Sequence, residues 1–274
     1  MKCRICPHHC ELSIGQTGRC RARRNVDGDI VPLNYGKVTS IALDPIEKKP
    51  LMRFYPGEFI LSVGGFGCNL SCPFCQNHEI SMAGEEFPTR PLPPEQLAEI
   101  AKELAREPRG NLGVAFTYNE PFISFEYVMD TAKLLKPLGL HTVLVTNGTV
   151  EQEPLRELLP WISAMNIDLK GFRQEYYDWL GGNLETVKNT IRLSSESVHV
   201  EVTTLIVPGE NDRPEEMEKE AEWLAGISPN IPFHISRFFP RYHVQNRPPT
   251  PVERIHQLCR VAGKYLKYVY PGNC

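Results

Sequence analysis

Short apolar segments alternate with longer amphipathic segments from residue 59 onward, and this alternation restricts the fold more than any other feature. The apolar runs have the length of buried strands and cover residues 59–63, 112–116, 142–146, 165–169, 198–207 and 232–236, with a seventh at 268–270. The intervening helix-like segments cover residues 94–106, 123–136, 151–159, 184–194, 214–225 and 251–264. Repeated strand–helix units require right-handed crossovers and a parallel sheet. About six such units predict an α/β fold, a full or partial parallel (β/α) barrel.

The first part of the chain has a different character. Residues 1–57 are rich in cysteine and turn residues, and the N-V-D-G-D sequence at 25–29 predicts a hairpin turn. A length of 274 residues suits one barrel with a small additional segment, and 41% hydrophobic residues suffice for its core. We therefore expect a Cys-rich N-terminal segment over 1–57, with a metal site and a role as a lid, and a barrel over 58–274.

Charge and hydropathy exclude several function classes. A formal net charge of −3 gives no reason to expect a nucleic-acid partner. No stretch approaches the roughly 20 apolar residues of a membrane span, and the N-terminus lacks the apolar core of a signal peptide. We expect a cytoplasmic protein without a membrane partner. In that reducing compartment, nine clustered cysteines favour metal or redox roles over disulfides.

Three cysteines follow the first predicted strand directly. Cys68, Cys72 and Cys75 have the spacing C-x3-C-x2-C in a glycine-flanked loop. Three thiolates can hold three irons of a 4Fe–4S cluster and leave the fourth iron open for a chelating ligand. The alternatives are a zinc site, which would need a fourth ligand such as His78, and three buried free cysteines. The spacing and the loop position favour the cluster.

The sequence resembles the radical S-adenosylmethionine (SAM) superfamily, whose signature is this triad with an aromatic residue, here Phe74, before the last cysteine. The resemblance is closest to the pyruvate formate-lyase-activating-enzyme branch and, within it, to the AmmeMemoRadiSam system radical SAM enzymes. The narrower match rests on four motifs: C-x2-C-P-H-x-C at residues 3–10, G-Q-T-G-R-C at 15–20, D-P-I-E-K-K-P-L at 44–51 and T-Y-N-E-P at 117–121.

The resemblance implies an oxidoreductase that uses a 4Fe–4S cluster to cleave SAM reductively. The product, a 5′-deoxyadenosyl radical, would abstract hydrogen from an unidentified substrate, with an electron from an external donor such as ferredoxin or flavodoxin. One substrate class is a glycine of a partner protein, as in glycyl-radical activases. The other is a small molecule or a different peptide target. A hypothesis of another class is a metal-stabilised scaffold protein that does not turn over SAM.

The resemblance also assigns residues to SAM. Phe74 would pack near the adenine, and Glu120, helped by Asn119, would bind the amino group. Lys170 would contact the carboxylate, with Asp168 on the same face of its strand.

Each of these assignments has a plainer alternative. Asn119 or Glu120 could cap the following helix, and Asp168 and Lys170 could form a surface ion pair. His243 is expected to touch SAM or the substrate, or else to be a surface histidine. Arg237 and Arg241 are expected at the substrate mouth.

The T-N-G sequence at 146–148 is interpreted as a turn. Related activating enzymes often have aspartate at the preceding position, where this chain has Val145. We therefore do not expect the monovalent-cation site of that branch.

Four further cysteines, Cys3, Cys6, Cys10 and Cys20, lie within the first 20 residues. Four soft ligands in a core-poor segment favour a stabilising metal, either zinc or a second iron–sulfur cluster. The zinc interpretation is favoured slightly, because a histidine-containing knuckle needs no redox function. The alternative is reduced cysteines without a ligand.

Overall fold

A computed structural model describes residues 1–274, and its central feature is an eight-stranded sheet in the order β12-β11-β10-β9-β8-β7-β5-β4. Its strands are β4 (Ser40–Pro45), β5 (Phe59–Gly64), β7 (Gly113–Phe116), β8 (His141–Thr146), β9 (Ala164–Asp168), β10 (His199–Ile206), β11 (Phe233–Arg237) and β12 (Val269–Gly272). Neighbours from β5 to β12 are parallel. Because β4 and β12 are the unpaired edges, the barrel is partial, and the predicted α/β class is confirmed.

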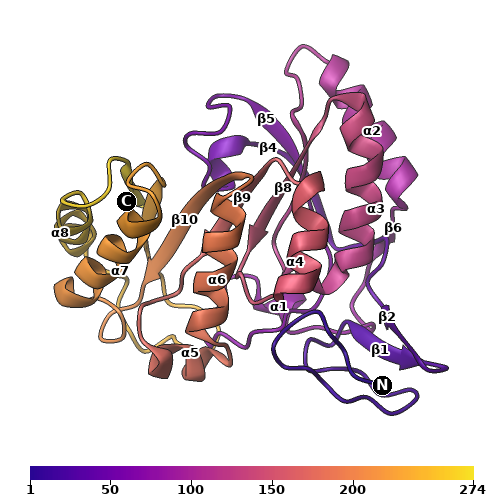
Figure 1. Ribbon diagram of the computed structural model, residues 1–274, viewed down its shortest axis with the longest axis horizontal. Helices are drawn as coiled ribbons and strands as arrows, with labels where there is room; N and C mark the ends of the chain where they lie inside the picture. The colour runs from indigo at the N-terminus through magenta and orange to yellow at the C-terminus, as the bar shows by residue number, and fades with distance from the viewer.

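Helices cover the outer face of this sheet (Figure 1). They are α2 (Pro94–Arg106), α3 (Phe125–Leu135), α4 (Gln152–Leu158), α6 (Leu184–Ser195), α7 (Pro214–Ile227) and α8 (Val252–Ala262). All six predicted helices are present, and α2 and α7 begin with proline at their first position, where the missing N–H costs nothing. The short helices α1 (His78–Ser81) and α5 (Gln174–Leu180) were not predicted, and α1 has only four residues, too few for a 3.6-residue pattern.

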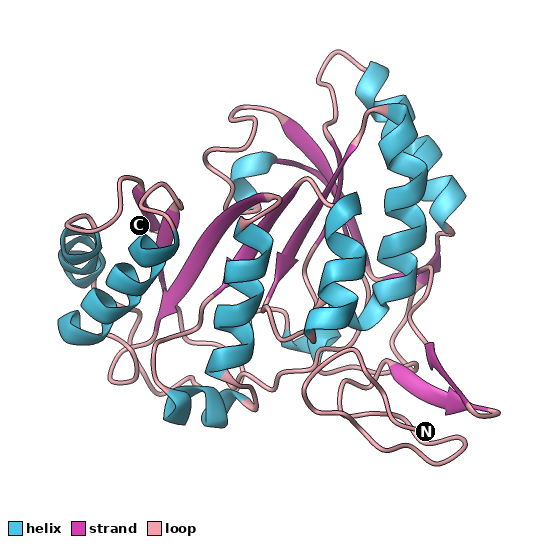
Figure 2. Ribbon diagram, viewed as in Figure 1, coloured by secondary structure: helices cyan, strands magenta, loops and turns pink.

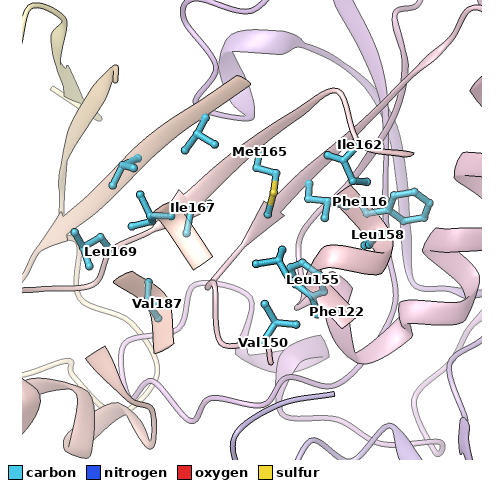
Figure 3. Packing of buried hydrophobic residues seen from close by; sticks show 14 of the residues in the cluster. Phe116, Phe122, Val150, Leu155, Leu158, Ile162, Met165, Ile167, Leu169 and Val187 are labelled. Carbon is cyan, nitrogen blue, oxygen red and sulfur yellow. The ribbon is translucent and has the colours of Figure 1, made fainter. Parts of the chain in front are cut away.

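The largest apolar core lies between the sheet and these helices. Figure 3 shows its middle, where Met165 and Ile167 of β9 face Leu155 of α4 and Val187 of α6. All four side chains are essentially inaccessible to solvent. Full burial of each is worth about 1.5–3 kcal/mol, which fixes the helices against the strands.

The motif at 44–51 closes the N-terminal end of the barrel. Asp44 lies near the end of strand β4, and its carboxylate accepts hydrogen bonds from the buried Lys49 Nζ at 2.9 Å and from Tyr118 Oη at 2.9 Å. The chain then crosses beneath the strands, where Ile46, Leu51 and Phe54 pack against inward-facing apolar residues of β5, β7, β8 and β9. This end of the barrel is therefore filled, and the opposite end is left for chemistry.

The N-terminal residues form a separate layer at the carboxyl ends of the strands. The predicted hairpin is confirmed as β1 (Arg23–Val26) paired with β2 (Asp29–Pro32), and a second small sheet joins β3 (Lys37–Val38) to β6 (Arg90–Pro91). Figures 1 and 2 place β1 and β2 at the same end of the molecule as α1 and α5. Strand β4 pairs antiparallel with β5, so part of the expected 1–57 segment belongs to the barrel sheet.

None of the helices combines the length and apolar character that a membrane span requires.

Candidate cluster and cofactor site

The three cysteines after β5 line one cavity of about 290 Å³ at the carboxyl ends of the strands. The cavity also receives residues from the ends of β7 to β12. Its lining consists of Cys68, Leu70, Cys72, Phe74, Cys75, Gln76, Asn77, Ser81, Thr117, Tyr118, Asn119, Glu120, Val145, Thr146, Asn147, Asp168, Lys170, Thr203, Leu205, Ser236 and Asn273. Because parallel strands end at one edge, residues far apart in sequence meet here.

The donor set of the triad fits a polynuclear cluster better than a single ion. Cys68, Cys72 and Cys75 share the cavity wall, and three thiolates are one donor short of a closed tetrahedral zinc site. In a four-iron cubane each cysteine binds a different iron, so the sulfur atoms need not converge on one point. His78, the candidate fourth zinc ligand, is not among the lining residues. Burial raises the pKa of the Cys72 thiol to about 11.

Glu120 sits deep in the cavity with its carboxylate already engaged. It accepts hydrogen bonds from Phe122 N at 3.0 Å, Thr146 Oγ1 at 2.7 Å and Asn147 N at 2.8 Å. Burial raises the pKa of this carboxyl to about 7, against the lowering effect of the three donors, while Asp168 adds to the rise. The contact with Phe122 is the expected helix-capping bond, so the capping interpretation holds while the side chain still lines the cavity.

Asn119 ties the cysteine loop to the end of β7. Its Oδ1 accepts from Gly65 N at 2.9 Å, and its Nδ2 donates to Gly67 O at 3.1 Å and to Phe66 O at 3.2 Å. These bonds fix the backbone just before Cys68. Asn119 therefore shapes the loop as well as lining the cavity.

Lys170 and Asp168 form an ion pair of 2.7 Å between Nζ and Oδ2 at the end of β9. Burial alone would lower the pKa of Lys170, but Asp168, which is paired with it, raises this pKa above its ordinary value. The side chains of Lys170 and Asp168 are 16% and 30% exposed, so the ion pair is partly buried rather than a fully solvated surface pair. The Lys170 ammonium therefore stays charged at neutral pH, and its side chain lines the cavity.

An aromatic wall stands beside the last two cysteines. Phe74 is 5% exposed, and its ring lies parallel to that of Tyr176 with centroids 6.5 Å apart. The ring centroids of Trp179 and Phe238 lie 5.7 and 6.4 Å from that of Phe74. Of these four rings only that of Phe74 lines the cavity, and the other three hold it in place as an apolar contact for a planar ring.

The residues expected from the sixth strand lie outside the cavity. His243 is exposed, and only its backbone approaches the triad loop, through an N–H that donates to Pro73 O at 2.8 Å. Arg237 donates to Thr250 O, and Arg241 is exposed. None of these three side chains lines the cavity, which instead receives Ser236 from this strand.

The four N-terminal cysteines line a second, much smaller cavity of about 10 Å³ together with His8. Cys3, Cys6 and Cys20 are each 7% exposed. Burial raises the pKa of the Cys6 thiol to about 12, and the neighbouring Cys20 and Cys3 add to the rise. The four side chains are thus gathered, although they are not arranged around one ion position.

Sequence reasoning did not identify Asn147 and Asn273 as cavity residues. Asn147 belongs to the T-N-G segment that was interpreted as a turn, and its amide Nδ2 lies 3.5 Å from Cys68 Sγ. Because Asn147 directly follows a predicted strand, its position could have indicated a residue of the cavity. Asn273 follows β12, whose register against β11 brings it to the cavity.

Comparison with known proteins assigns the family. The model of the radical SAM superfamily matches residues 62–224, more than half of the chain. The chain belongs to the radical SAM superfamily. The matched region contains the triad, Glu120, Asp168 and Lys170, so the cavity is that of a radical SAM fold. The four N-terminal cysteines lie outside the matched region.

Two relatives are similar to this chain in sequence, and one solved structure is similar to it in fold. An uncharacterized protein of Methanocaldococcus jannaschii, MJ0808, is 39% identical over all of this chain and 81% of its own length. The pyruvate formate-lyase 1-activating enzyme of Escherichia coli is 28% identical over 53% of this chain and 60% of the enzyme. A radical SAM methyltransferase from Sphaerobacter thermophilus shares the fold with a TM-score of 0.61, at 17% identity over 80% of this chain and 67% of that structure.

Proposed function

We propose that this chain binds a 4Fe–4S cluster through Cys68, Cys72 and Cys75 and uses it to cleave SAM reductively, generating a radical that abstracts hydrogen from a substrate. The observation that carries the proposal is the single cavity that joins the triad to Glu120 and Lys170. A scaffold protein has no need of paired charges in a cavity, because their desolvation is costly.

The residues of the cavity have distinct proposed roles. When bound, the cluster supplies one electron to the sulfonium of SAM. Lys170 binds the SAM carboxylate with its ammonium, which Asp168 keeps charged. Glu120 faces the amino group, and Phe74 packs near the adenine. The filled opposite end of the barrel keeps water from entering behind the cofactors.

The experiment that tests the function is anaerobic reconstitution with iron and sulfide, followed by dithionite and SAM. We expect about four irons at the triad and formation of 5′-deoxyadenosine. An intact cluster that yields no 5′-deoxyadenosine would favour the scaffold hypothesis.

Lys170→Met should weaken SAM binding. A hydrogen bond to a charged group is worth about 1.5–3 kcal/mol, so we expect roughly a 10- to 150-fold higher dissociation constant. Anaerobic calorimetric titration of the cluster-loaded protein measures it. Lys102→Met is the matched control, because Lys102 lies on the outer helix α2 and pairs only with Glu99. Unchanged SAM affinity would leave Lys170 only as the partner of Asp168.

For the substrate we propose a glycine of a partner protein, with an external one-electron donor of the ferredoxin or flavodoxin class. The support is the similarity to pyruvate formate-lyase-activating enzymes. The alternative is a small molecule or another peptide. Its support is that Val145 lines the cavity where related activating enzymes often have aspartate, and that this chain has an additional Cys-rich N-terminal segment. A glycyl-radical EPR doublet on a candidate partner would favour the first; its absence, with hydrogen transfer to a small molecule, would favour the second.

For the N-terminal cysteines we propose a bound metal, supported by the cavity that Cys3, Cys6, Cys10 and Cys20 share. The same metal analysis separates the two forms. Zinc together with about four irons would indicate a structural zinc site, and about eight irons would indicate a second cluster.

A further inference from the structure

Asn147 at the end of β8 contacts the first cysteine of the triad. Its Nδ2 lies 3.5 Å from Cys68 Sγ and donates to Asn69 Oδ1 at 2.9 Å. The same sulfur is 3.4 Å from Leu70 N. Asn147 is 7% exposed. Cys68 Sγ therefore has two N–H donors within reach, one from the backbone and one from a side chain.

Two partners orient the Asn147 amide: its Oδ1 accepts from Thr149 N at 2.8 Å, and its Nδ2 donates to Asn69, which is 1% exposed and makes three hydrogen bonds of its own. The Asn69 side chain donates to Thr149 O at 2.7 Å while its Oδ1 accepts from Asn147. Its backbone carbonyl contacts His8 Nε2 at 2.8 Å. Because a carbonyl only accepts, His8 must carry the proton on Nε2 and donate. The N-terminal segment thus fixes the residue next to Cys68.

Two other contacts join the N-terminal segment to the loop that carries Cys68. Gly67 has φ +85°, and a Cβ there would lie 2.5 Å from Cys20 O, so only glycine permits this approach. Arg21 Nη2 donates to Cys68 O at 3.1 Å and to Ser81 O at 3.0 Å. The segment is therefore part of the immediate surroundings of Cys68.

We propose that Asn147 is a positioning residue that donates a hydrogen bond to the Cys68 sulfur, and that His8 holds it in place through Asn69, so that the N-terminal segment helps to set the reduction potential of the cluster. This inference rests on the proposed function, which places a cluster ligand at Cys68. Reduction adds negative charge to the cluster, and an N–H donor at a ligand sulfur stabilises that charge. The donor raises the reduction potential, and its removal lowers it.

The first experiment is an EPR-monitored redox titration of the reconstituted protein. Asn147→Ala removes the donor, so its midpoint should shift to a more negative potential. Asn147→Asp, of nearly the same shape, replaces the donor by a carboxylate and should shift it further. Asn230→Ala, at an exposed loop position before β11, is the control and should match the wild type. Fully loaded Asn147 variants with the wild-type midpoint would overturn the proposal.

The second experiment tests the link to the N-terminal segment. His8→Ala should shift the midpoint in the same direction by less, and His8→Gln, whose amide can donate, should restore it. If His8 acts through Asn147, adding His8→Ala to Asn147→Ala should give no further shift. Additive shifts would overturn this link. If an Asn147 variant loads no cluster, the midpoint potentials of the His8 variants still test the proposal. A wild type without a 4Fe–4S EPR signal would instead contradict the proposed function.

Discussion

Cys72→Ala should abolish the formation of 5′-deoxyadenosine, to the level of a reaction without enzyme. Cys72 lines the cavity between the other two cysteines of the triad and is 8% exposed. A cluster held by only two cysteines lacks one of its three protein ligands. Anaerobic reconstitution followed by chromatographic assay of SAM products measures the effect.

The control for this variant is Cys259→Ala. Cys259 lies on α8, outside the cavity, and packs partly buried against the outer core. It should keep full iron content and wild-type formation of 5′-deoxyadenosine. A Cys72→Ala protein that forms as much 5′-deoxyadenosine as the control would exclude the triad as the catalytic cluster site.

Glu201→Ala should lower the free energy of unfolding by about 3–5 kcal/mol, as expected when one partner of a buried charged network is removed. The Glu201 carboxylate, on β10, is fully buried. It accepts from Met52 N at 2.9 Å and Arg53 N at 2.7 Å, and it contacts His199 Nε2 at 2.9 Å and His234 Nε2 at 2.6 Å. The substitution leaves these donors without an acceptor and frees the segment that closes the barrel.

The pH dependence of stability gives an independent check on Glu201. Burial alone would raise the pKa of its carboxyl, but His199, His234 and Arg53 N together lower it from 4.5 to about 2. Because the folded pKa is depressed, the stabilising contribution is complete above pH 4.5 and is lost as the pH falls toward 2. Glu201→Gln should therefore lose less stability than the wild type over this window.

Denaturation at several pH values measures both effects. Glu153→Ala is the control, because Glu153 is an exposed glutamate of α4 and should change the unfolding free energy by less than about 0.5 kcal/mol. A Glu201→Ala protein as stable as this control would show that the segment over residues 46–54 is held by its apolar contacts alone.

The sequence by itself determined the parallel strand–helix alternation and the position of the triad. Both depend on local patterns: the periodicity of apolar residues and the spacing of cysteines within one loop. The resemblance to the radical SAM superfamily singled out Glu120, Asp168 and Lys170, and they lie near the triad because parallel strands end at the same edge. The edge strand β4 escaped prediction because it is half-exposed, without a continuous apolar run, and is separated from the other strands by a turn-rich segment.

Only the tertiary structure decided which side chains meet across long stretches of sequence. The contact between His8 and Asn69 joins residues 61 positions apart, and that between Met52 and Glu201 joins residues 149 apart. Neither pair has a spacing or a periodicity that a sequence could reveal. The exclusion of His243 from the cavity likewise depends on how the loop after β11 turns. Local patterns fix elements and their ends, whereas hydrogen bonds between elements depend on packing distances that only the folded chain sets.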